Sequence, residues 1–516
     1  MNGAESLVRT LVAGGVNVCF ANPGTSEMHF VAALDRVEGM RCVLGLFEGV
    51  VTGAADGYFR MKGTPASTLL HLGPGLANGL ANLHNAKKAR SGIVNIVGQH
   101  ATYHIGYNAP LTSDVEGLAR PMSEWVRTSP NARSVAADGA AAIAAAKSSP
   151  PQIATLILPA DTAWNEADGI AQVPTPSQTP GFSTEAVEKA AKVLHGDGAH
   201  TLMLVTGSAL TEQGLALAQR ISGKTGCTVM GQTYHPRMAR GRGRFSINRI
   251  PYLIEQALPI LKDFKYIVLV EANDPVAFFA YPNKPSELKP EGCEVHRLTA
   301  WGENSVAALE ALSDALGAKP HDVKPQKVAE LNKPTGPLTL TSIAQAIACA
   351  IPENAIVVDE SITTGRCFFP PTAAAPPHDW LQNMGGSIGF STPVATGAAV
   401  ACPDRKVICM VGDGSAMYTI QSLWTQAREN LDVVTIVFAN RIYQILRGEF
   451  DGVGAGEPGQ RALDMLKIDR PTIDFVALAR GMGVPGRAVT SADDFNKALA
   501  EAVAEPGPRL IEVQMG

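Results

Sequence analysis

Short runs of β-branched and other apolar residues alternate along the whole chain with longer stretches rich in Ala and Leu. An apolar run of about four to eight residues between turn residues is typical of a buried strand, and the longer stretches are typical of helices. The alternation predicts βαβ units, in which helices cover both faces of a parallel sheet. We therefore expect an α/β fold of doubly wound parallel-sheet domains. The expected strands are residues 15–20, 67–71, 93–98, 153–159, 201–205, 266–270, 355–359, 406–411 and 433–438.

Two polar segments that contain prolines interrupt this alternation. Residues 164–182 contain Pro174, Pro176 and Pro180, and a second such segment covers residues 317–327. Both compositions are typical of linkers. We therefore expect three domains of ordinary α/β size, at residues 1–165, 180–322 and 335–516.

Composition and charge exclude several classes of protein. With 46% hydrophobic and 18% charged residues, the 516-residue chain can bury large cores and is not disordered throughout. Its net charge of -5 offers no basic surface for a nucleic acid. No apolar run reaches the roughly 18 residues of a spanning helix, so we expect no membrane partner. The eight cysteines are scattered and no secretory signal precedes them, so we expect a cytoplasmic protein with reduced thiols.

The strongest chemical signal is an aspartate in a glycine turn. Gly412, Asp413 and Gly414 follow the strand expected at 406–411, and Asn440 follows the strand expected at 433–438, with a helix expected between them at 418–430. The ends of neighbouring parallel strands meet at one edge of a sheet, so Asp413 and Asn440 can reach one cation. Oxygen ligands suit Mg²⁺, and a helix start suits a diphosphate bound through it. For the glycine turn alone, a tight turn without a ligand is the better interpretation, and Asn440 favours the metal site.

Two further residues suit proton transfer. Glu48 stands among Leu, Phe and Val residues, where a carboxyl group suits proton exchange with a bound heterocycle, although a solvent-facing glutamate at a helix start is the alternative. His71 follows an expected strand and precedes a glycine turn, so it suits acid–base catalysis near neutral pH. A structural histidine with satisfied hydrogen bonds is the alternative for that position.

Taken in order, these motifs resemble the thiamine diphosphate (ThDP)-dependent enzymes that act on 2-oxo acids, over nearly the whole chain. The resemblance implies a pyrimidine-binding, a central and a diphosphate-binding domain, with ThDP and Mg²⁺ as cofactors. It implies that Asp413, Asn440 and the main-chain oxygen of Ile442 bind Mg²⁺, although Ala439 replaces an asparagine that is common in the motif.

The same resemblance implies how the cofactor is held. Glu48 would share a proton with the pyrimidine ring, the carbonyl group of Gly386 would accept from the pyrimidine amino group, and Ile388 would support the bent shape of the cofactor. The other positions that it implies for cofactor binding are Asn22, Pro23, Gly24, Gly412, Gly414, Ser415 and Tyr443.

Within the family, the chain is most similar to benzoylformate decarboxylase. His71 matches a histidine that handles protons in that enzyme, and Thr25 replaces a serine that contacts the substrate carboxylate. The similarity implies non-oxidative decarboxylation of an aromatic or branched 2-oxo acid to an aldehyde, with possible carboligation. Ala280 stands where the decarboxylase has a second histidine, which leaves the substrate open. Other possible pocket residues, equally consistent with packing or surface positions, are Phe279, Tyr281, His100, His104 and residues 446–450.

Acetolactate synthase, a transferase that condenses two 2-oxo acids, is the alternative. The turn of Gly73, Pro74 and Gly75, followed by Asn78, is closer to that of acetolactate synthase than to that of the decarboxylase. However, Leu111 stands where acetolactate synthase has a glutamine. Residues 230–233 are only faintly similar to a flavin-binding segment, so we do not expect FAD. In this family the cofactor lies between the first domain of one subunit and the third domain of another, which implies a homodimer or homotetramer whose only other partner is a small 2-oxo acid.

Overall fold

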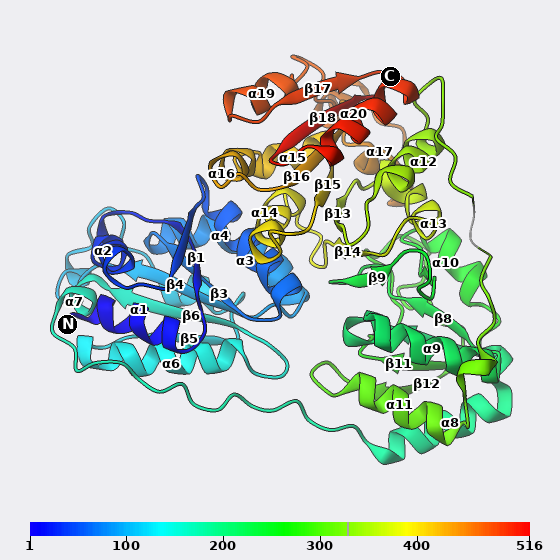
Figure 1. Cartoon of the computed structure of the whole chain (residues 1–516), viewed down its shortest axis with the longest axis horizontal. Helices are drawn as coiled ribbons and strands as arrows, with labels where there is room; N and C mark the ends of the chain where they lie inside the picture. The colour runs from blue at the N-terminus through cyan, green and yellow to red at the C-terminus, as the bar shows by residue number, and fades with distance from the viewer. Residues whose placement is uncertain (328–329, 516) are drawn as a thin grey trace.

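The structure is a computed structural model of the chain, and it describes residues 1–327 and 330–515. Three β-sheets organise these residues, and helices cover the sheets (Figure 1). The first sheet lies at the left of the figure in blue and cyan, the second at the lower right in green, and the third at the top in yellow to red. The predicted α/β fold class is therefore confirmed.

The first sheet has six parallel strands in the order β2-β1-β3-β4-β6-β5. Successive side chains of β1 point to opposite faces, because Phe20 packs in the core with α3 and α4 while Cys19 and Ala21 pack in the core with α1 and α6. Both faces are thus buried, as in a doubly wound sheet. Its elements are α1 (Gly3–Ala13), β1 (Val18–Asn22), α2 (Met28–Arg36), β2 (Arg41–Leu44), α3 (Glu48–Lys62), β3 (Ala66–Leu70), α4 (Leu72–Lys88), β4 (Ile93–Gln99), α5 (Val115–Ala119), β5 (Trp125–Thr128), α6 (Val135–Ala146), β6 (Ile153–Pro159) and α7 (Ala160–Trp164).

The second sheet has five parallel strands in the order β10-β8-β7-β11-β12. The chain reaches it after α7 along the lower border of the view in Figure 1. Its elements are α8 (Thr184–Asp197), β7 (Thr201–Val205), α9 (Glu212–Thr225), β8 (Thr228–Gly231), β10 (Asn248–Arg249), α10 (Ile254–Leu261), β11 (Tyr266–Val270), β12 (Glu294–Thr299) and α11 (Ser305–Ala315).

The third sheet has seven strands in the order β17-β18-β16-β15-β13-β14-β9. All neighbours pair in parallel except β9, which pairs antiparallel with β14 at the edge. The elements are β9 (Met238–Arg240), α12 (Leu340–Ala350), β13 (Ile356–Glu360), α13 (Phe369–Thr372), β14 (His378–Gln382), α14 (Ser391–Ala401), β15 (Val407–Gly412), α15 (Asp413–Thr419), α16 (Ser422–Arg428), β16 (Val433–Ala439), α17 (Gln444–Gly452), α18 (Gln460–Leu466), α19 (Phe475–Gly481), β17 (Gly486–Val489), α20 (Ala492–Ala504) and β18 (Arg509–Gln514).

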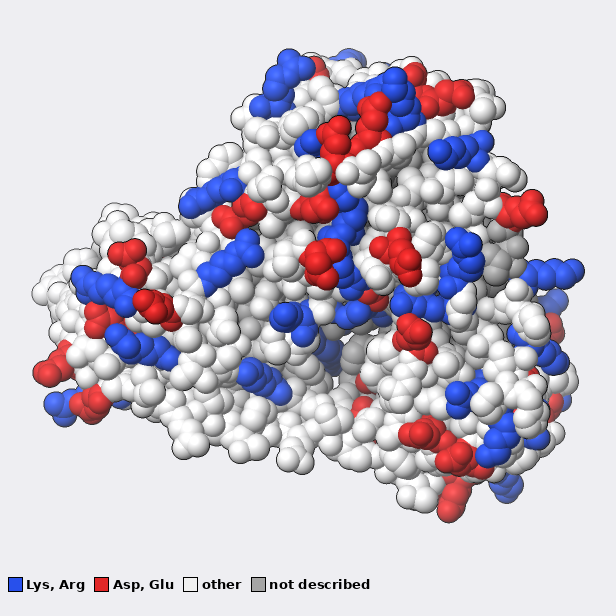
Figure 2. All heavy atoms as spheres, in the orientation of Figure 1, with Lys and Arg blue, Asp and Glu red and all other residues white. Residues whose placement is uncertain are grey.

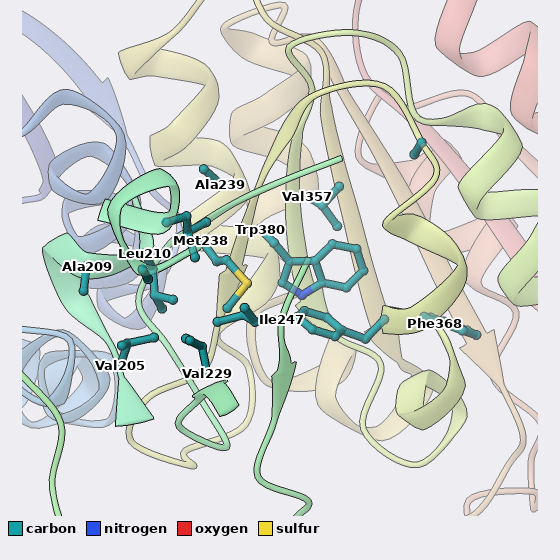
Figure 3. Close-up of a cluster of buried hydrophobic side chains, with 14 of the residues drawn as sticks. Val205, Ala209, Leu210, Val229, Met238, Ala239, Ile247, Val357, Phe368 and Trp380 are labelled. Atoms are coloured by element: carbon teal, nitrogen blue, oxygen red, sulfur yellow. The ribbon is translucent and has the colours of Figure 1, made fainter. Parts of the chain in front are cut away.

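Strand β9 joins the second and third units, because it comes from the chain between β8 and β10 but lies in the third sheet. Its Met238 pairs with Trp380 of β14, and both side chains are fully buried. Figure 3 shows this core, in which Ile247 lies beside Trp380, and Val205 of the second unit belongs to the same buried cluster. The second unit is therefore attached to the third in two ways: β9 is a strand of the third sheet, and side chains of both units pack in one hydrophobic core.

The first and third units meet where α3 packs against α14. The backbones approach closely at Gly57, where an added Cβ would lie 2.1 Å from the carbonyl oxygen of Val394. A larger residue would force the two helices apart, so Gly57 is required by the packing. Asn82 of α4 also donates from Nδ2 to the carbonyl oxygen of Gly389, at 3.2 Å.

Two local predictions are corrected. The helix expected at residues 418–430 is two short helices, α15 and α16, and the first already begins at Asp413. The strand expected at residues 15–20 begins only at Val18, because Gly14 and Gly15 end α1 in a turn. The other expected strands are present at or close to their expected ranges.

Two surface properties bear on the expected partners. No helix within residues 1–327 and 330–515 is both long enough and apolar enough to cross a membrane. On the face in Figure 2, basic and acidic side chains alternate over all three units.

Candidate functional site

Glu48 begins α3 at the edge of the first sheet. It is only 9% exposed, so it starts a helix without facing solvent, unlike the alternative considered from the sequence. Asn78 of α4 donates from Nδ2 to Oε2 of Glu48 at 3.0 Å. Asn22, at the end of β1, donates to the carbonyl oxygen of Gly45 at 2.9 Å and so fixes the loop that leads to Glu48. The carboxyl group is therefore held in one orientation.

His71 lies at the end of the neighbouring strand β3 and is paired with a carboxyl group that sequence reasoning did not assign. Its Nδ1 lies 2.7 Å from Oε2 of Glu27, and the main-chain N–H of Gly24 donates to the same oxygen at 2.8 Å. Glu27 is 2% exposed. Burial raises the pKa of Glu27, although the hydrogen bonds from Gly24 and His71 act in the opposite direction. The buried carboxyl group of Glu27 and the ring of His71 therefore form a hydrogen-bonded pair.

The segment before Glu27 shapes the space around His71. A Cβ added at Gly24 would lie 2.3 Å from Nδ1 of His71, so only glycine leaves room for the ring. Thr25 is exposed in the short turn that follows, and Pro23 is half-buried. No local pattern around Glu27 marks it as the partner of His71, which lies 44 residues further along the chain.

Asp413 and Asn440 lie at the ends of the adjacent strands β15 and β16. Asp413 is 4% exposed, and its two carboxyl oxygens accept from main-chain N–H groups of Gly414 at 2.8 Å and Arg441 at 2.6 Å. Burial raises the pKa of Asp413, and these N–H groups oppose the rise. The structure thus brings together the two residues that the sequence placed at one cation.

Tyr443 connects the two loops. Its ring covers Gly414, where an added Cβ would lie 2.4 Å from Cε1. Oδ1 of Asn440 accepts from the main-chain N–H of Ile442 at 3.2 Å, which fixes the turn after β16. Gly412 and Ser415 flank Asp413 at the start of α15.

The donor set fits Mg²⁺ by its chemistry. A carboxylate, a side-chain amide and a main-chain carbonyl group all present hard oxygen atoms, which Mg²⁺ prefers. The set contains a single acidic residue, in agreement with the finding that no group of three or more His, Cys, Asp or Glu in the described ranges could hold a metal.

The loop with Gly386 and Ile388 precedes α14 and is fixed by asparagines. Oδ1 of Asn383 accepts from the N–H groups of Gly385 and Gly386 at 3.1 and 2.9 Å, and Asn85 of α4 donates to the carbonyl oxygen of Ser387 at 2.9 Å. Gly386 has a φ of +78° and is exposed, while Ile388 is half-buried. The loop is therefore held from both the first and the third unit.

The two groups of predicted residues lie on different units of the chain. The side-chain contact of Glu48 comes from α4, and those of Asp413 come from its own turn and the loop after β16. The side chains of Glu48 and Asp413 are thus each held by contacts within their own unit, whereas the Gly386 loop is held from both units.

An aromatic segment of the second unit lies over Gly386. A Cβ added at Gly386 would lie 2.8 Å from Cζ of Phe278. Phe278 and Phe279 are both about half exposed, at 45% and 54%. Ala280 and Tyr281 follow them, and the hydroxyl group of Tyr281 donates to Glu449 of α17 at 2.7 Å.

His100 and His104 follow β4, and their rings lie 5.4 Å apart. Partial burial, and then His104 and His71, lower the pKa of His100. His104 is exposed.

A cavity of about 770 Å³ lies between the three units, and its lining includes none of Glu48, His71, Asp413 and Asn440. At its wall, Glu271 accepts from the N–H and the hydroxyl group of Ser208 at 2.5 and 2.9 Å. Burial raises the pKa of Glu271 to about 7. A carboxyl group thus occupies the turn after β7, where an α/β domain would otherwise offer N–H groups to a phosphate.

Two family models match the chain. The model described as thiamine pyrophosphate enzyme, N-terminal TPP binding domain, matches residues 1–118, and the one described as thiamine pyrophosphate enzyme, C-terminal TPP binding domain, matches residues 368–513. The range matched by the N-terminal model contains Glu48 and His71, and the range matched by the C-terminal model contains Asp413 and Asn440.

Two curated relatives span nearly the whole chain. A protein of Mycobacterium tuberculosis, provisionally named as the acetolactate synthase large subunit IlvX, is 52% identical over 515 residues, 99% of either chain. Benzoylformate decarboxylase of Pseudomonas aeruginosa is 30% identical over 533 residues, covering 97% of this chain and 96% of its own.

Among solved structures, a thiamine diphosphate-dependent 4-hydroxybenzoylformate decarboxylase of Rhodococcus jostii RHA1 has a TM-score of 0.87 at 26% identity. The match covers 100% of this chain and 99% of that one. Fold, domain models and full-length relatives agree, and the chain belongs to the thiamine diphosphate-dependent enzymes of the decarboxylase and acetolactate synthase family.

Proposed function

We propose that this enzyme removes CO₂ from a benzoylformate-like 2-oxo acid without oxidation and releases an aldehyde, with carboligation as a side activity. The observation that carries the proposal is the pairing of His71 with Glu27 at the sheet edge that also holds Glu48. Because Glu27 occupies Nδ1, Nε2 of His71 remains for exchange with a substrate. The benzoylformate decarboxylases among the relatives support this reaction.

The proposed reaction needs one proton per turnover. The bond between the keto carbon and the carboxylate breaks, its electron pair stays behind, and the keto carbon then takes a proton from Nε2 of His71. Bound ThDP supplies the electron sink that makes this bond cleavage possible. Glu27 keeps the ring of His71 in place, and the hydroxyl group of Thr25 would bind the substrate carboxylate.

The residues of the third sheet would hold the cofactor. Asp413, Asn440 and the carbonyl oxygen of Ile442 would bind Mg²⁺, which neutralises the diphosphate. Gly386 would accept a hydrogen bond from the pyrimidine ring through its carbonyl oxygen, and Ile388 would support that ring. Further contacts are proposed for Asn22, Pro23, Gly24, Gly412, Gly414, Ser415 and Tyr443.

Glu48 would hold a proton at the pyrimidine ring. This Glu48 would belong to a different subunit from the Asp413 that binds the same cofactor. The proposal of a homodimer or homotetramer is supported by the separate location of Glu48 and Asp413 on different sheets. We place the enzyme in the cytoplasm, without a nucleic-acid or membrane partner. We do not expect FAD, because the carboxyl group of Glu271 stands where a flavin diphosphate would need donors.

The second candidate is a transferase of acetolactate synthase type, which joins two 2-oxo acids. Two observations favour it: the relative with 52% identity carries that name, and Ala280 stands where the decarboxylase branch has a second histidine. A site with one histidine would return protons more slowly and leave time for a second 2-oxo acid to react.

One experiment separates the two candidates. The protein is incubated with ThDP, Mg²⁺ and either pyruvate or benzoylformate, and the products are identified by NMR. Benzaldehyde from benzoylformate supports the decarboxylase, and acetolactate from pyruvate supports the transferase. Glu48→Gln should abolish either product, and a wild-type protein that forms neither would refute the proposal.

A further inference from the structure

Within a single chain, helix α17 has few contacts. It follows the turn of Asn440 to Tyr443 directly, and none of its residues is buried. Leu446 on this helix is 45% exposed. A surface helix of nine residues is marginal unless tertiary contacts fix it, so its few contacts decide its position.

A carboxylate provides the specific contact. Oε1 of Glu449 accepts from the hydroxyl group of Tyr252 at 3.0 Å, and Oε2 accepts from that of Tyr281 at 2.7 Å. Both tyrosines belong to the second unit, so the contact links it to α17 of the third. Burial and the neighbouring carboxylate raise the pKa of both phenols, which therefore keep their protons and remain donors. Hydrogen bonds to an ionised acceptor are among the stronger ones.

The fit around Tyr281 is tight on both sides. A Cβ added at Gly452, at the end of α17, would lie 3.2 Å from Cε1 of Tyr281. On the same ring, Nζ of Lys284 lies 5.1 Å from the centroid. Tyr281 is therefore held between the helix and a lysine, with its hydroxyl group directed at Glu449.

The tyrosines also hold the aromatic segment that reaches Gly386. The ring of Phe278 lies 5.5 Å from that of Tyr252 and 4.9 Å from that of Phe279, and its tip meets Gly386. Residues 276–281 are thus fixed between α17 at one end and the Gly386 loop at the other. Leu446, one helical turn before Glu449, lies on the same side of α17.

We propose that Glu449 is a positioning residue that docks α17 on residues 276–281 and so fixes an apolar wall, with Phe279 and Leu446, that selects the side chain of the 2-oxo acid. The inference rests on the proposed function, since it concerns the substrate of that site. It assigns a 2-oxo acid whose side chain is larger than a methyl group and apolar.

Hydrogen exchange of the cofactor-free protein tests the docking without any assay of activity. In Glu449→Ala, and in the double variant Tyr252→Phe/Tyr281→Phe, the amides of α17 should exchange at least about tenfold faster than in the wild type. Asp451→Ala, on an exposed position of the same helix, is the matched control and should leave exchange unchanged. Equal exchange in Glu449→Ala and the wild type would overturn the docking.

Substrate preference tests the role of the wall. Glu449→Ala should lower kcat/KM for benzoylformate about tenfold or more and change that for pyruvate less than threefold, while Glu449→Gln, which keeps one acceptor, should recover part of the loss. An equal loss for both substrates would overturn the selective role. A wild-type protein without activity on any 2-oxo acid would refute the proposed function, and the exchange measurement would still decide the docking.

Discussion

The edges of the first and third sheets are built from different kinds of hydrogen bond. At the first, side chains hold side chains: Asn78 holds Glu48, and Glu27 holds His71. At the third, main-chain N–H groups hold both oxygens of Asp413. Side-chain partners orient groups and leave them able to exchange protons, whereas main-chain donors fix a negative charge that binds a cation. This difference is consistent with the proposed division, in which the first edge transfers protons and the third edge anchors the cofactor.

The largest expected effect comes from removing the carboxyl group at the first edge. Glu48→Gln keeps the shape of the side chain and its place beside Asn78 but cannot exchange the proton. We expect kcat to fall by about 10²- to 10⁴-fold. ThDP affinity, measured by calorimetry with Mg²⁺, should change little. If Glu48→Gln kept a tenth or more of the wild-type kcat, the proposed role of Glu48 in proton transfer would be contradicted.

The matching change at the third edge should act on binding instead. Asp413→Asn removes the carboxylate that the N–H groups of Gly414 and Arg441 surround, so Mg²⁺ would lose the single acidic residue of its proposed ligand set. We expect the affinity for ThDP and Mg²⁺ to fall by roughly 10- to 100-fold, and turnover to recover partly at high Mg²⁺. Asp404→Asn, on an exposed loop, is the control. Unchanged affinity would show that this edge does not anchor the cofactor.

The sequence was sufficient for about half of the strands, mainly the long buried ones, and for residues at the ends of those strands. Buried strands such as β16 are continuous apolar runs, and the residue after such a run must lie at the sheet edge, which places Asp413, Asn440 and His71. Strand β9 was not predictable, because three residues at a sheet edge carry no periodic pattern. The break between α15 and α16 was missed as well; it falls beside Thr419, whose hydroxyl group donates to the distant carbonyl oxygen of Gly389 at 2.9 Å.

The side-chain partners of His71 and Tyr281 could not be predicted from the sequence. Glu27 is 44 residues from His71, and Glu449 is 168 residues from Tyr281. Such pairs form only after three sheets are in place, and neither local propensity nor strand position specifies them. What the sequence supplies is the position of each reacting group, and what the fold supplies is the partner that orients it.

Two glycine substitutions should separate the edges again, with smaller effects. In Gly24→Ala the new methyl group would displace the ring of His71, so turnover should fall roughly tenfold and more than ThDP affinity does. In Gly414→Ala it would displace the ring of Tyr443, and ThDP affinity should fall more than turnover at saturation. Steady-state kinetics at varied ThDP measures both quantities. If Gly24→Ala and Gly414→Ala changed turnover and ThDP affinity in the same proportion, the proposed separation of proton transfer from cofactor anchoring would be contradicted.

The smallest effect is a pH dependence of stability that only the first edge should show through Glu27. Burial raises the pKa of Glu27 in the folded state above its ordinary value of 4.5, so folding favours the protonated form. This contribution to stability is complete below about pH 4.5 and is lost as the pH rises through the raised pKa. Gln is neutral at every pH, so the stability of Glu27→Gln relative to the wild type should increase as the pH rises. Thermal unfolding of the cofactor-free proteins between pH 5 and 8 measures this difference. A difference that stays constant over this range would show that Glu27 does not change its protonation state within it, which would contradict the prediction.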